Sequence, residues 1–313
     1  MKSISNSKIL ITGGAGFIGS TLADKLIESN TIVIVDDLSM GKVENLPKSD
    51  HLHFFEHSIT DTKFMEKLLV EWNFDYIYLM AAIASVADTV ARPLETHAVN
   101  QEANVHILDV IRRNKLQIKK LLFTSSAAVY GNNLELPKKE TSPIEPLTPY
   151  AIDKYASERF TLDYGALYDI PTVATRFFNV YGPKQNPNSP YSGVLSLISD
   201  AAEHKHKFTV LGDGTQTRDF VYIDDVIEAL VLLMADSNIN NEVFNVATGE
   251  STSLHDVIAI FKIISGNNFE VDYSDDRVGD IKNSVADIKK ISSVNYIPRY
   301  DIKKGLIKYC ANK

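Results

Sequence analysis

Tyr150 and Lys154 are the two residues of this sequence whose types and spacing best suit proton transfer. They stand four residues apart in a segment that begins after Pro149, where a helix would place both side chains on one face. A phenol has an ordinary pKa of about 10 and is a poor base at neutral pH, but a neighbouring ammonium stabilises the phenolate and lowers that pKa. The same spacing is common on solvated helix faces. Whether the pair is catalytic or merely exposed must therefore be judged from the surrounding segments.

A run of hydroxyl side chains, Thr124, Ser125 and Ser126, ends an apolar segment upstream of this pair. The apolar residues before the run predict a buried strand, and the carboxyl edge of a parallel sheet is where such proteins bind ligands. Hydroxyl groups at a strand end can also bind only their own backbone. The run therefore supplies either a catalytic hydroxyl or a local cap.

Glycines follow the first apolar segment at Gly13, Gly16 and Gly19. Glycine lets the chain turn tightly, so that backbone N–H groups and the positive end of a helix can approach a pyrophosphate. Asp36 ends the next apolar segment, where a carboxylate can bind the 2'-hydroxyl of a ribose and repel a 2'-phosphate. The loop and the carboxylate together predict NAD rather than NADP as cofactor; the alternative is an ordinary strand-turn-helix with a surface aspartate.

Short β-branched segments alternate with longer amphipathic ones through the first half, which predicts an α/β fold with a Rossmann-type doubly wound parallel sheet. Strands are expected near residues 8–12, 31–36, 51–56, 75–80, 119–125 and 171–177. Helices are expected near residues 17–29, 61–72, 93–113 and 150–167.

Turn-forming residues are dense at 181–190, and a helix at 225–234 and a strand at 243–246 are expected to return to the first domain. We therefore expect an NAD-binding Rossmann domain at 1–179, with 221–248 returning to it. The segments 180–220 and 249–313 would form a smaller α/β substrate-binding domain.

Composition argues against several classes of function. The 313 residues carry 32 basic and 40 acidic side chains, a net charge of -8 without a basic block, which argues against a nucleic-acid partner. Cys310 is the one cysteine, and no apolar run approaches the roughly 20 residues that span a bilayer, so we expect no disulfide, no membrane partner and a cytoplasmic location. No third ligand accompanies His204 and His206 in the sequence, so no metal site is expected.

The glycine spacing from Thr12 to Gly19 resembles that of the extended short-chain dehydrogenase/reductase family, and the resemblance covers essentially the whole chain. It implies that Ser126, Tyr150 and Lys154 form a catalytic triad in which the Ser126 hydroxyl binds the reacting oxygen. Asn100 matches an asparagine that helps to order this site, although an asparagine on a helix can equally be a polar packing group. The implied NAD-binding residues are Gly13, Gly16, Phe17, Ile18, Gly19, Asp36, Asp37, Ser39, Ser58, Ile59, Ala81, Ala82, Asn100, Tyr150, Lys154 and Phe177.

Ala127 and Ala128 follow the hydroxyl run where related dehydratases carry an aspartate-glutamate pair and related decarboxylases keep a glutamate. The resemblance therefore narrows to the nucleoside-diphosphate-hexose 4-epimerases. In that reaction Tyr150 takes the proton of the sugar 4-hydroxyl while C4 passes a hydride to NAD. The resulting keto sugar turns within the site before the hydride returns, which inverts C4 and regenerates NAD.

The second domain would then bind a UDP-sugar. The resemblance implies contacts from Ser85, Ser126, Asn179, Tyr191, Val194, Arg218, Arg277, Asp280 and Ser284. Arginine suits phosphate because its planar fork donates bidentate hydrogen bonds, although most individual arginines are surface charges.

Ser284 is small where relatives restricted to glucose and galactose carry a tyrosine. We therefore expect UDP-N-acetylglucosamine and UDP-N-acetylgalactosamine to interconvert, with UDP-glucose and UDP-galactose as further substrates. Two alternatives stay open: epimerisation of another sugar nucleotide such as a UDP-uronic acid, and a catalytically inactive NAD-binding regulator.

The chain also departs from the family pattern near the cofactor. Ser58 and Ile59 stand where relatives place an aspartate near the adenine, so adenine recognition is expected to be weaker or indirect. Residues 79–82 differ from the usual His-Leu-Ala-Ala but keep both alanines, which let the backbone approach the cofactor. The resemblance further implies a homodimer formed by the helices at 93–113 and 150–167.

Overall fold

The computed structural model describes residues 3–185, 193–275 and 281–312. The chain divides into two compact units, and each is described by itself. The first consists of Met1–Gly131, Pro143–Arg176 and Ile227–Phe244, and the second of Asn132–Ser142, Phe177–Val226 and Asn245–Lys313. The predicted division of labour between a cofactor-binding and a substrate-binding domain stays a prediction.

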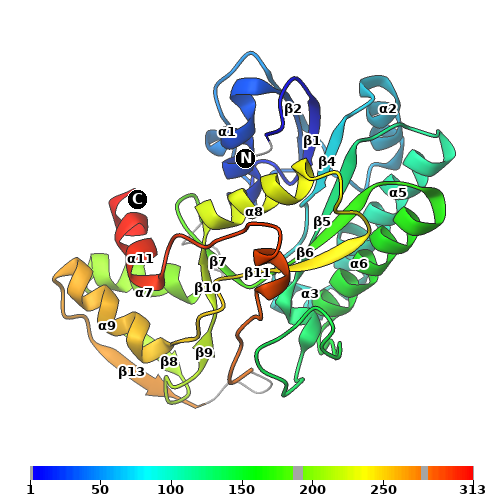
Figure 1. Ribbon diagram of the computed structural model, residues 1–313. Coiled ribbons are helices and arrows are strands. Elements are labelled where there is room, and N and C mark those ends of the chain that lie inside the picture. Colours follow the sequence, from blue (N-terminus) through cyan, green and yellow to red (C-terminus); the bar gives the residue numbers. More distant parts are fainter. Residues whose placement is uncertain (1–2, 186–192, 276–280, 313) are drawn as a thin grey trace. The chain divides into compact units, whose positions relative to one another are not determined.

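A seven-stranded sheet forms the centre of the first unit, in the order β11-β6-β5-β4-β1-β2-β3 (Figure 1). Its strands are β1 (Lys8–Thr12), β2 (Thr31–Asp36), β3 (Leu52–Glu56), β4 (Tyr76–Leu79), β5 (Lys120–Ser126), β6 (Thr172–Phe177) and β11 (Glu242–Val246). β1 pairs in parallel with β2 and with β4, so that Leu10 lies opposite Val33 on one side and Ile77 on the other. The chain leaves β1 in one direction and later returns to its other side, and open α/β sheets bind ligands at the carboxyl ends of such a pair.

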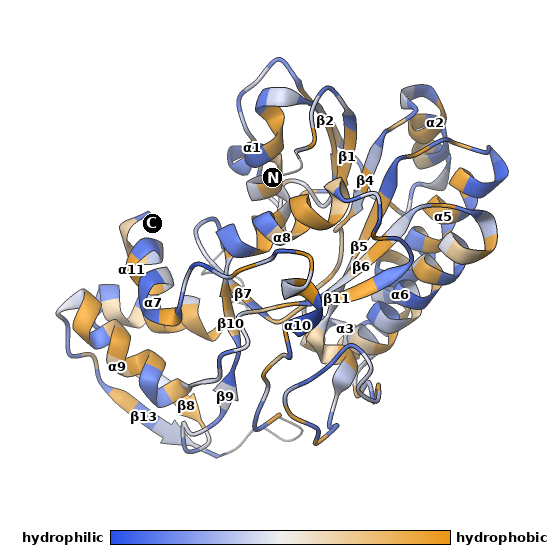
Figure 2. Ribbon diagram, in the orientation of Figure 1, coloured by the Kyte–Doolittle hydropathy of each residue, from blue (hydrophilic) through white to orange (hydrophobic). Residues whose placement is uncertain are grey.

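The strands β1, β2 and β5 are buried on both faces because helices cover both. Ile9, Leu10 and Ile11 are fully buried, and Figure 2 shows apolar residues along β1 and β5. Right-handed crossovers place α1 (Phe17–Leu26) on one face and the helices that follow β3, β4 and β5 on the other. These are α2 (Thr62–Trp72), α5 (Ala103–Arg113) and α6 (Pro149–Tyr168); α2 packs on α5, and α5 packs on α6.

The predicted helix at 93–113 is interrupted. It consists of α4 (Pro93–His97), a π-helix at Ala98–Glu102 and then α5. A π-helical segment accommodates an extra residue and re-aims the side chains around it, frequently at functional sites. α3 (Val86–Ala91) precedes it and adds a helix that the sequence pattern did not predict.

The second unit is built from short strand pairs and three longer helices. β7 (Asn179–Tyr181) pairs with β10 (Phe220–Tyr222), β8 (Phe208–Leu211) with β13 (Val271–Ser274), and β9 (Thr217–Arg218) with β12 (Thr252–Ser253). Its helices are α7 (Val194–His204), α9 (Leu254–Ser265), α10 (Lys289–Ser292) and α11 (Ile302–Ala311), and α8 (Ile223–Ala235) begins in this unit.

A buried carboxylate organises the strand ends of this unit. Asp219 accepts hydrogen bonds from the backbone N–H groups of Thr248, Gly249 and Ala286, at 2.8, 2.9 and 3.2 Å. Burial raises the pKa of this carboxyl group, and those hydrogen bonds oppose the rise. Asp219 thereby joins three segments that are distant in sequence.

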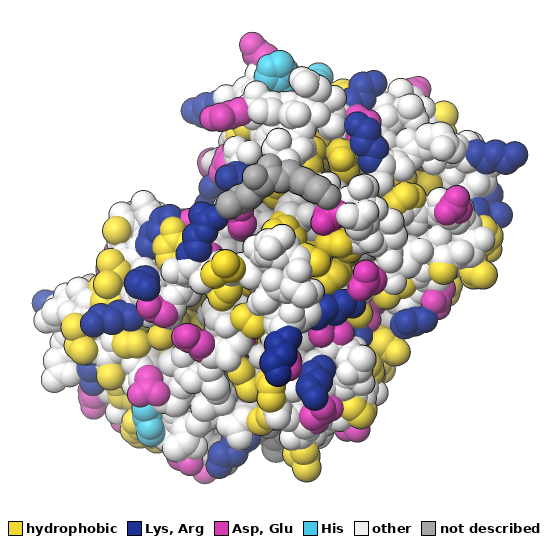
Figure 3. All heavy atoms as spheres, viewed as in Figure 1, with side chains coloured by type: hydrophobic (Ala, Val, Ile, Leu, Met, Phe, Trp, Pro, Cys, Tyr) yellow, Lys and Arg dark blue, Asp and Glu magenta, His cyan; other side chains and the backbone are white. Residues whose placement is uncertain are grey.

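The surface carries charges of both signs. Figure 3 shows Lys and Arg side chains interspersed with Asp and Glu side chains over the face in view. Among the described residues, no helix combines the length and the apolar character needed to cross a membrane.

Candidate active site

α6 positions the predicted proton-transfer pair. Thr148 caps the helix by accepting a hydrogen bond from Ala151 N at 3.2 Å, and Pro149 occupies the first turn, where its missing N–H costs nothing. Lys154 is 3% exposed and its Nζ donates to the Thr124 carbonyl oxygen at 2.8 Å. The same ammonium lies 5.9 Å from the centroid of the Tyr150 ring. The helix therefore brings phenol and ammonium together, as the spacing predicts.

Both groups have perturbed pKa values. Burial lowers the pKa of Lys154 from 10.5 to about 8, and the negative charge of Asp153 opposes that shift. Burial raises the pKa of Tyr150, while a hydrogen bond with Ser126 lowers it. Shifted pKa values in two neighbouring groups are typical of acid-base sites, because charges interact more strongly in a low-dielectric interior than in water. Tyr150 is thus a phenol that needs a further positive charge before it can serve as a base.

Ser126 ends β5, and its hydroxyl is hydrogen-bonded both to the backbone and to Tyr150. Its Oγ accepts a hydrogen bond from Ala128 N at 3.2 Å, which caps a 3-10 turn at Ala127–Tyr130. The same side chain is hydrogen-bonded to Tyr150. A cap that fixes the serine rotamer also presents the hydroxyl to the phenol, so the two readings are compatible.

The glycine loop lies between β1 and α1 and fits a pyrophosphate. Gly13 has φ +71°, and a Cβ there would lie 2.7 Å from the Ala81 Cα; a Cβ on Gly19 would lie 2.4 Å from the Gly13 carbonyl oxygen. Within this described loop no side chain caps the helix at Gly16, so the first N–H groups of α1, on Phe17 and Ile18, are left for an anion.

Asp36 ends β2 beside this loop. Its carboxylate is 8% exposed and accepts hydrogen bonds of 2.9 Å from the backbone N–H groups of Ala15 and Leu38. Burial raises the pKa of Asp36, whereas the backbone donors lower it. Asp37 and Ser39 follow on the exposed turn, where Ser39 N donates to Asp37 Oδ1 at 3.0 Å. The cradle of glycines and this buried carboxylate fit the ribose and pyrophosphate of NAD.

Asn100 lies in the π-helix and is fully buried. Its amide exchanges two hydrogen bonds with the backbone of Ile83: Ile83 N donates to Oδ1 at 2.8 Å and Nδ2 donates to Ile83 O at 3.1 Å. Asn100 therefore fixes the segment that leaves β4. Thr12, which the sequence did not single out, holds the start of the same segment by accepting from Ala81 N at 3.2 Å.

The remaining cofactor candidates also follow strand ends. Ser58 and Ile59 follow β3, Ala82 follows Ala81 beyond β4, and Phe177 ends β6. Because the neighbouring strands β3, β2, β1, β4 and β5 run parallel, their carboxyl ends lie along one edge of the sheet. Ser85 is 4% exposed and caps α3 by accepting from Asp88 N at 2.9 Å.

The described substrate candidates of the second unit lie on connected strands. Arg218 is on β9, where its Nη1 donates to the Thr217 carbonyl oxygen at 2.9 Å. Ser284 N donates to the same oxygen at 3.1 Å, so the structure brings these two candidates together. Asn179 begins β7 and Val194 begins α7. The other candidates, Tyr191, Arg277 and Asp280, lie outside the described residues.

The structure places a third side chain of a metal-binding type, Asp200, beside the two histidines. The Asp200 carboxylate lies 3.0 Å from His204 Nδ1 and 3.3 Å from His206 Nε2. The signal was the four-residue spacing of Asp200 and His204 on α7, which places both on one face. The expectation that this protein binds no metal stays a prediction.

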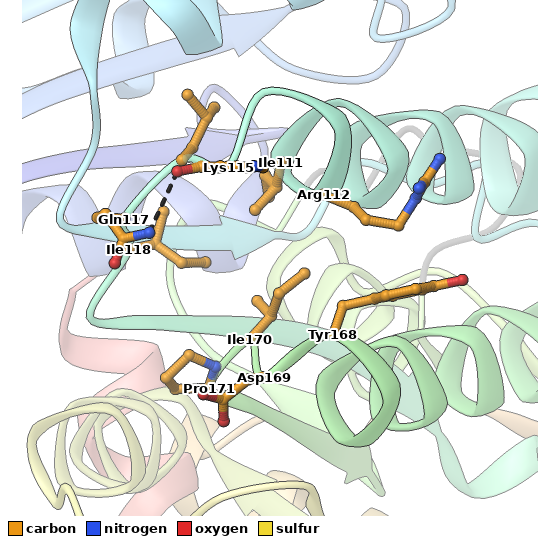
Figure 4. A pocket seen from close by; sticks show the side chains of 10 residues that line it. Ile111, Arg112, Lys115, Gln117, Ile118, Tyr168, Asp169, Ile170 and Pro171 are labelled. Carbon is orange, nitrogen blue, oxygen red and sulfur yellow. Dashed lines mark hydrogen bonds between the residues drawn. The ribbon is translucent and has the colours of Figure 1, made fainter.

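A hollow of about 420 Å³ lies at the opposite edge of the sheet, between the C-terminal ends of α5 and α6 (Figure 4). Ile111, Ile118 and Ile170 line it, and the Arg112 guanidinium stacks 5.2 Å from the centroid of the Tyr168 ring. It contains none of the predicted site residues.

Comparison with known proteins assigns the family. Residues 9–247 match the model of the NAD dependent epimerase/dehydratase family. A putative UDP-glucose 4-epimerase of Methanocaldococcus jannaschii is 37% identical over 301 residues, which cover 95% of each chain.

Solved structures agree with this assignment. A UDP-glucose 4-epimerase of Thermotoga maritima, solved with UDP-glucose, is 35% identical with a TM-score of 0.92 and covers 97% of this chain and 98% of its own. A UDP-N-acetylglucosamine 4-epimerase of Methanobrevibacter ruminantium, in complex with UDP-N-acetylmuramic acid, is 36% identical with a TM-score of 0.93, covering 99% and 98%. The chain belongs to the NAD dependent epimerase/dehydratase family, and the predicted fold class, enzyme class and NAD dependence are confirmed.

Proposed function

We propose that this family member is a UDP-sugar 4-epimerase that interconverts UDP-N-acetylglucosamine and UDP-N-acetylgalactosamine, with UDP-glucose and UDP-galactose as further substrates. The observation that carries the proposal is the connection of Ser126, Tyr150 and Lys154 at the end of β5. These three groups can remove and return the proton of one hydroxyl. Bound NAD would supply the acceptor and donor of the hydride.

The residues of this chain divide the proton chemistry among them. Ser126 donates to the sugar O4 and holds it beside the phenol oxygen of Tyr150. Tyr150, as phenolate, takes the O4 proton as the C4–H bond breaks, and returns it when that bond forms again on the opposite face. The charge of Lys154 stabilises the phenolate, and its hydrogen bond to the Thr124 carbonyl keeps the ammonium in place.

Ala127 and Ala128 favour epimerisation over elimination or decarboxylation. They follow Ser126 directly and form the turn that Ser126 caps. Methyl groups transfer no protons, so positions 127 and 128 add no second acid or base next to Ser126 and Tyr150. The two alanines therefore favour a reaction in which only the 4-hydroxyl exchanges a proton with the protein.

The choice of sugar rests on Ser284. Its side chain is small and half-buried on the segment that pairs with β9, near Arg218. A relative that is 36% identical is named a UDP-N-acetylglucosamine 4-epimerase and was solved with a UDP-sugar that carries an N-acetyl group. Both facts support a pocket that accepts a 2-acetamido substituent.

The test is product analysis with purified protein and a panel of UDP-N-acetylglucosamine, UDP-N-acetylgalactosamine, UDP-glucose, UDP-galactose, UDP-glucuronic acid and dTDP-glucose. We expect equilibration of the two N-acetylated sugars, and Ser284→Tyr should lose that activity while keeping UDP-galactose turnover. Turnover of UDP-galactose alone by the unmodified protein would refute the sugar assignment, and turnover of UDP-glucuronic acid alone would favour the uronic acid alternative.

Tyr150→Phe separates an enzyme from an NAD-binding regulator. The variant should bind NAD and lose turnover by at least about 10³-fold, because the proton acceptor is gone. The matched control is Tyr164→Phe on the same helix, whose ring packs against Phe160 and Tyr168. Full activity in Tyr150→Phe would contradict the mechanism.

A homodimer remains part of the proposal. α6 exposes apolar side chains at Ile152, Phe160 and Leu167, which are 52%, 38% and 72% exposed. Covering them with a second copy would remove apolar surface from water. Light scattering should report a dimer, and Phe160→Lys should shift it toward monomer.

A further inference from the structure

Asp153 lies within the Tyr150–Lys154 turn of α6, but its side chain is turned into the protein rather than toward solvent. The side chain is only 5% exposed, and its Oδ1 lies 2.6 Å from His97 Nδ1. Its Oδ2 is buried with no hydrogen-bond partner among the residues that the structure describes. A buried carboxylate with one partner is costly, so its retention next to the catalytic pair calls for a role.

His97 connects this carboxylate with solvent. It is the last residue of α4, directly before the π-helix, and its side chain is 42% exposed. In the tautomer that carries a proton on Nδ1, His97 donates this hydrogen bond to the carboxylate. The irregular segment thus positions two side chains at once, with His97 directed to Asp153 and Asn100 directed to Ile83.

Other charges around α6 are matched among themselves. On α6 itself Glu158 pairs with Arg176 and Arg159 with Asp163, and on the helices packed against it Arg92 pairs with Asp88 and Glu95, and Asp109 with Arg112 and Arg113. Glu102 is exposed, His106 contacts the Thr62 carbonyl, and Lys120 is held by backbone carbonyl oxygens at the far end of β5. Asp153 is the acidic group that acts on Lys154 by its charge.

We propose that Asp153, held by His97, is a positioning residue that keeps Lys154 in its charged form during catalysis. The proposal rests on the proposed roles of Tyr150 and Lys154. Burial works against the ammonium, and the adjacent carboxylate offsets part of that cost through the Coulomb interaction at low dielectric. His97 holds the carboxylate in this position through its contact with Oδ1.

The consequence is a defined change in the pH dependence of turnover. Loss of the negative charge lowers the pKa of Lys154 further below the value of about 8 that it has in the structure. The basic limb of the kcat/KM profile in Asp153→Asn should therefore move to lower pH by about one unit. On that limb kcat/KM should fall about tenfold relative to the unmodified enzyme, with NAD affinity unchanged.

Two histidine variants test the second half of the proposal. His97→Leu removes the donor and should reproduce the shift of Asp153→Asn. His97→Gln can keep an N–H group directed toward Asp153, so it should shift the basic limb of the kcat/KM profile less than His97→Leu does. The matched control is Asp163→Asn, which removes the same charge from an exposed position of α6 and should leave the profile in place.

The outcomes separate this inference from the proposed function. Suppose that the unmodified protein turns over UDP-sugars. If kcat/KM of Asp153→Asn then falls at the same basic pH as that of Asp163→Asn, the inference is wrong and the proposed function stands. If the unmodified protein turns over no substrate, an NMR titration of Lys154 Nζ in NAD-free protein still decides: a fall in its pKa in Asp153→Asn supports the inference, and an unchanged pKa overturns it. If Asp153→Asn does not fold, the two His97 variants decide. A lower Lys154 pKa in His97→Leu than in His97→Gln supports the inference, and equal pKa values overturn it.

Discussion

Replacing Lys154 by methionine should stabilise the first unit while removing the proposed phenolate stabilisation. The fold holds this ammonium at 3% exposure and lowers its pKa from 10.5 to about 8. Each pKa unit corresponds to about 1.4 kcal/mol, so burial of the charge costs about 3 kcal/mol at neutral pH. Methionine has a similar length and no charge, but it loses the hydrogen bond to Thr124, worth about 1 kcal/mol. The net gain in the free energy of unfolding is about 2 kcal/mol.

The pH dependence of this gain follows from the direction of the pKa shift. The folded-state pKa of Lys154 lies below its unfolded value, so the penalty in the unmodified protein is complete below about pH 8. It decreases as the pH rises from about 8 to about 10.5, because only the unfolded chain still binds the proton in that window. The advantage of Lys154→Met should therefore be about 2 kcal/mol at pH 6.5 and close to zero at pH 9.5.

Urea unfolding followed by tryptophan fluorescence measures this difference. Trp72 is the one tryptophan of the chain and stacks on Phe74 within the first unit, so its emission reports on the unit that contains Lys154. Lys67→Met is the control, because that side chain is 72% exposed on α2 and should change stability by less than about 0.5 kcal/mol. A variant that is less stable at pH 6.5, or a gain that does not shrink at pH 9.5, would refute the reasoning.

Three further predictions concern other parts of the first unit. Gly13→Ala places a methyl group at a positive φ and 2.7 Å from the Ala81 Cα, so NAD titration should show at least about tenfold weaker binding. An unchanged affinity would show that the glycine loop does not bind NAD. Glu158→Gln removes the carboxylate charge that lies 2.6 Å from the buried Arg176 guanidinium and should lower the free energy of unfolding by about 3 kcal/mol in urea; a loss below about 1 kcal/mol would mean that the pair is solvated. Asp36→Ser should lower the preference for NAD over NADP at least about tenfold in direct binding, and an unaltered ratio would exclude Asp36 from the ribose site.

The strands β1 and β2 could be predicted because both are buried on both faces and bounded by turn residues. β1 and β2 have the predicted bounds, since a continuous apolar run between polar residues defines them in sequence. The positions of the glycine loop and of Asp36 could be predicted equally well, because a strand-turn-helix unit fixes where their backbone must lie. Local patterns thus determined the cofactor half of the candidate site.

The missed features depend on contacts between segments that are far apart in sequence. His97 and Asp153 are separated by 56 residues, and nothing in either local sequence signals their pairing. The π-helix at Ala98–Glu102 was also missed, because its residues have the same apolar spacing as a regular helix to within one position. Its effect appears only when the side chains of Asn100 and His97 are seen to reach different partners.

α6 shows why the usual rule for orienting a helix fails at this site. Charged residues normally mark the solvated face, yet Asp153, Lys154 and Glu158 are all buried. Each has a specific partner on another element: His97 for Asp153, the Thr124 carbonyl for Lys154, and Arg176 for Glu158. Because a buried charge costs stability unless it has a partner, contacts with other elements, rather than the apolar spacing of the helix, decide which side chains of α6 face inward.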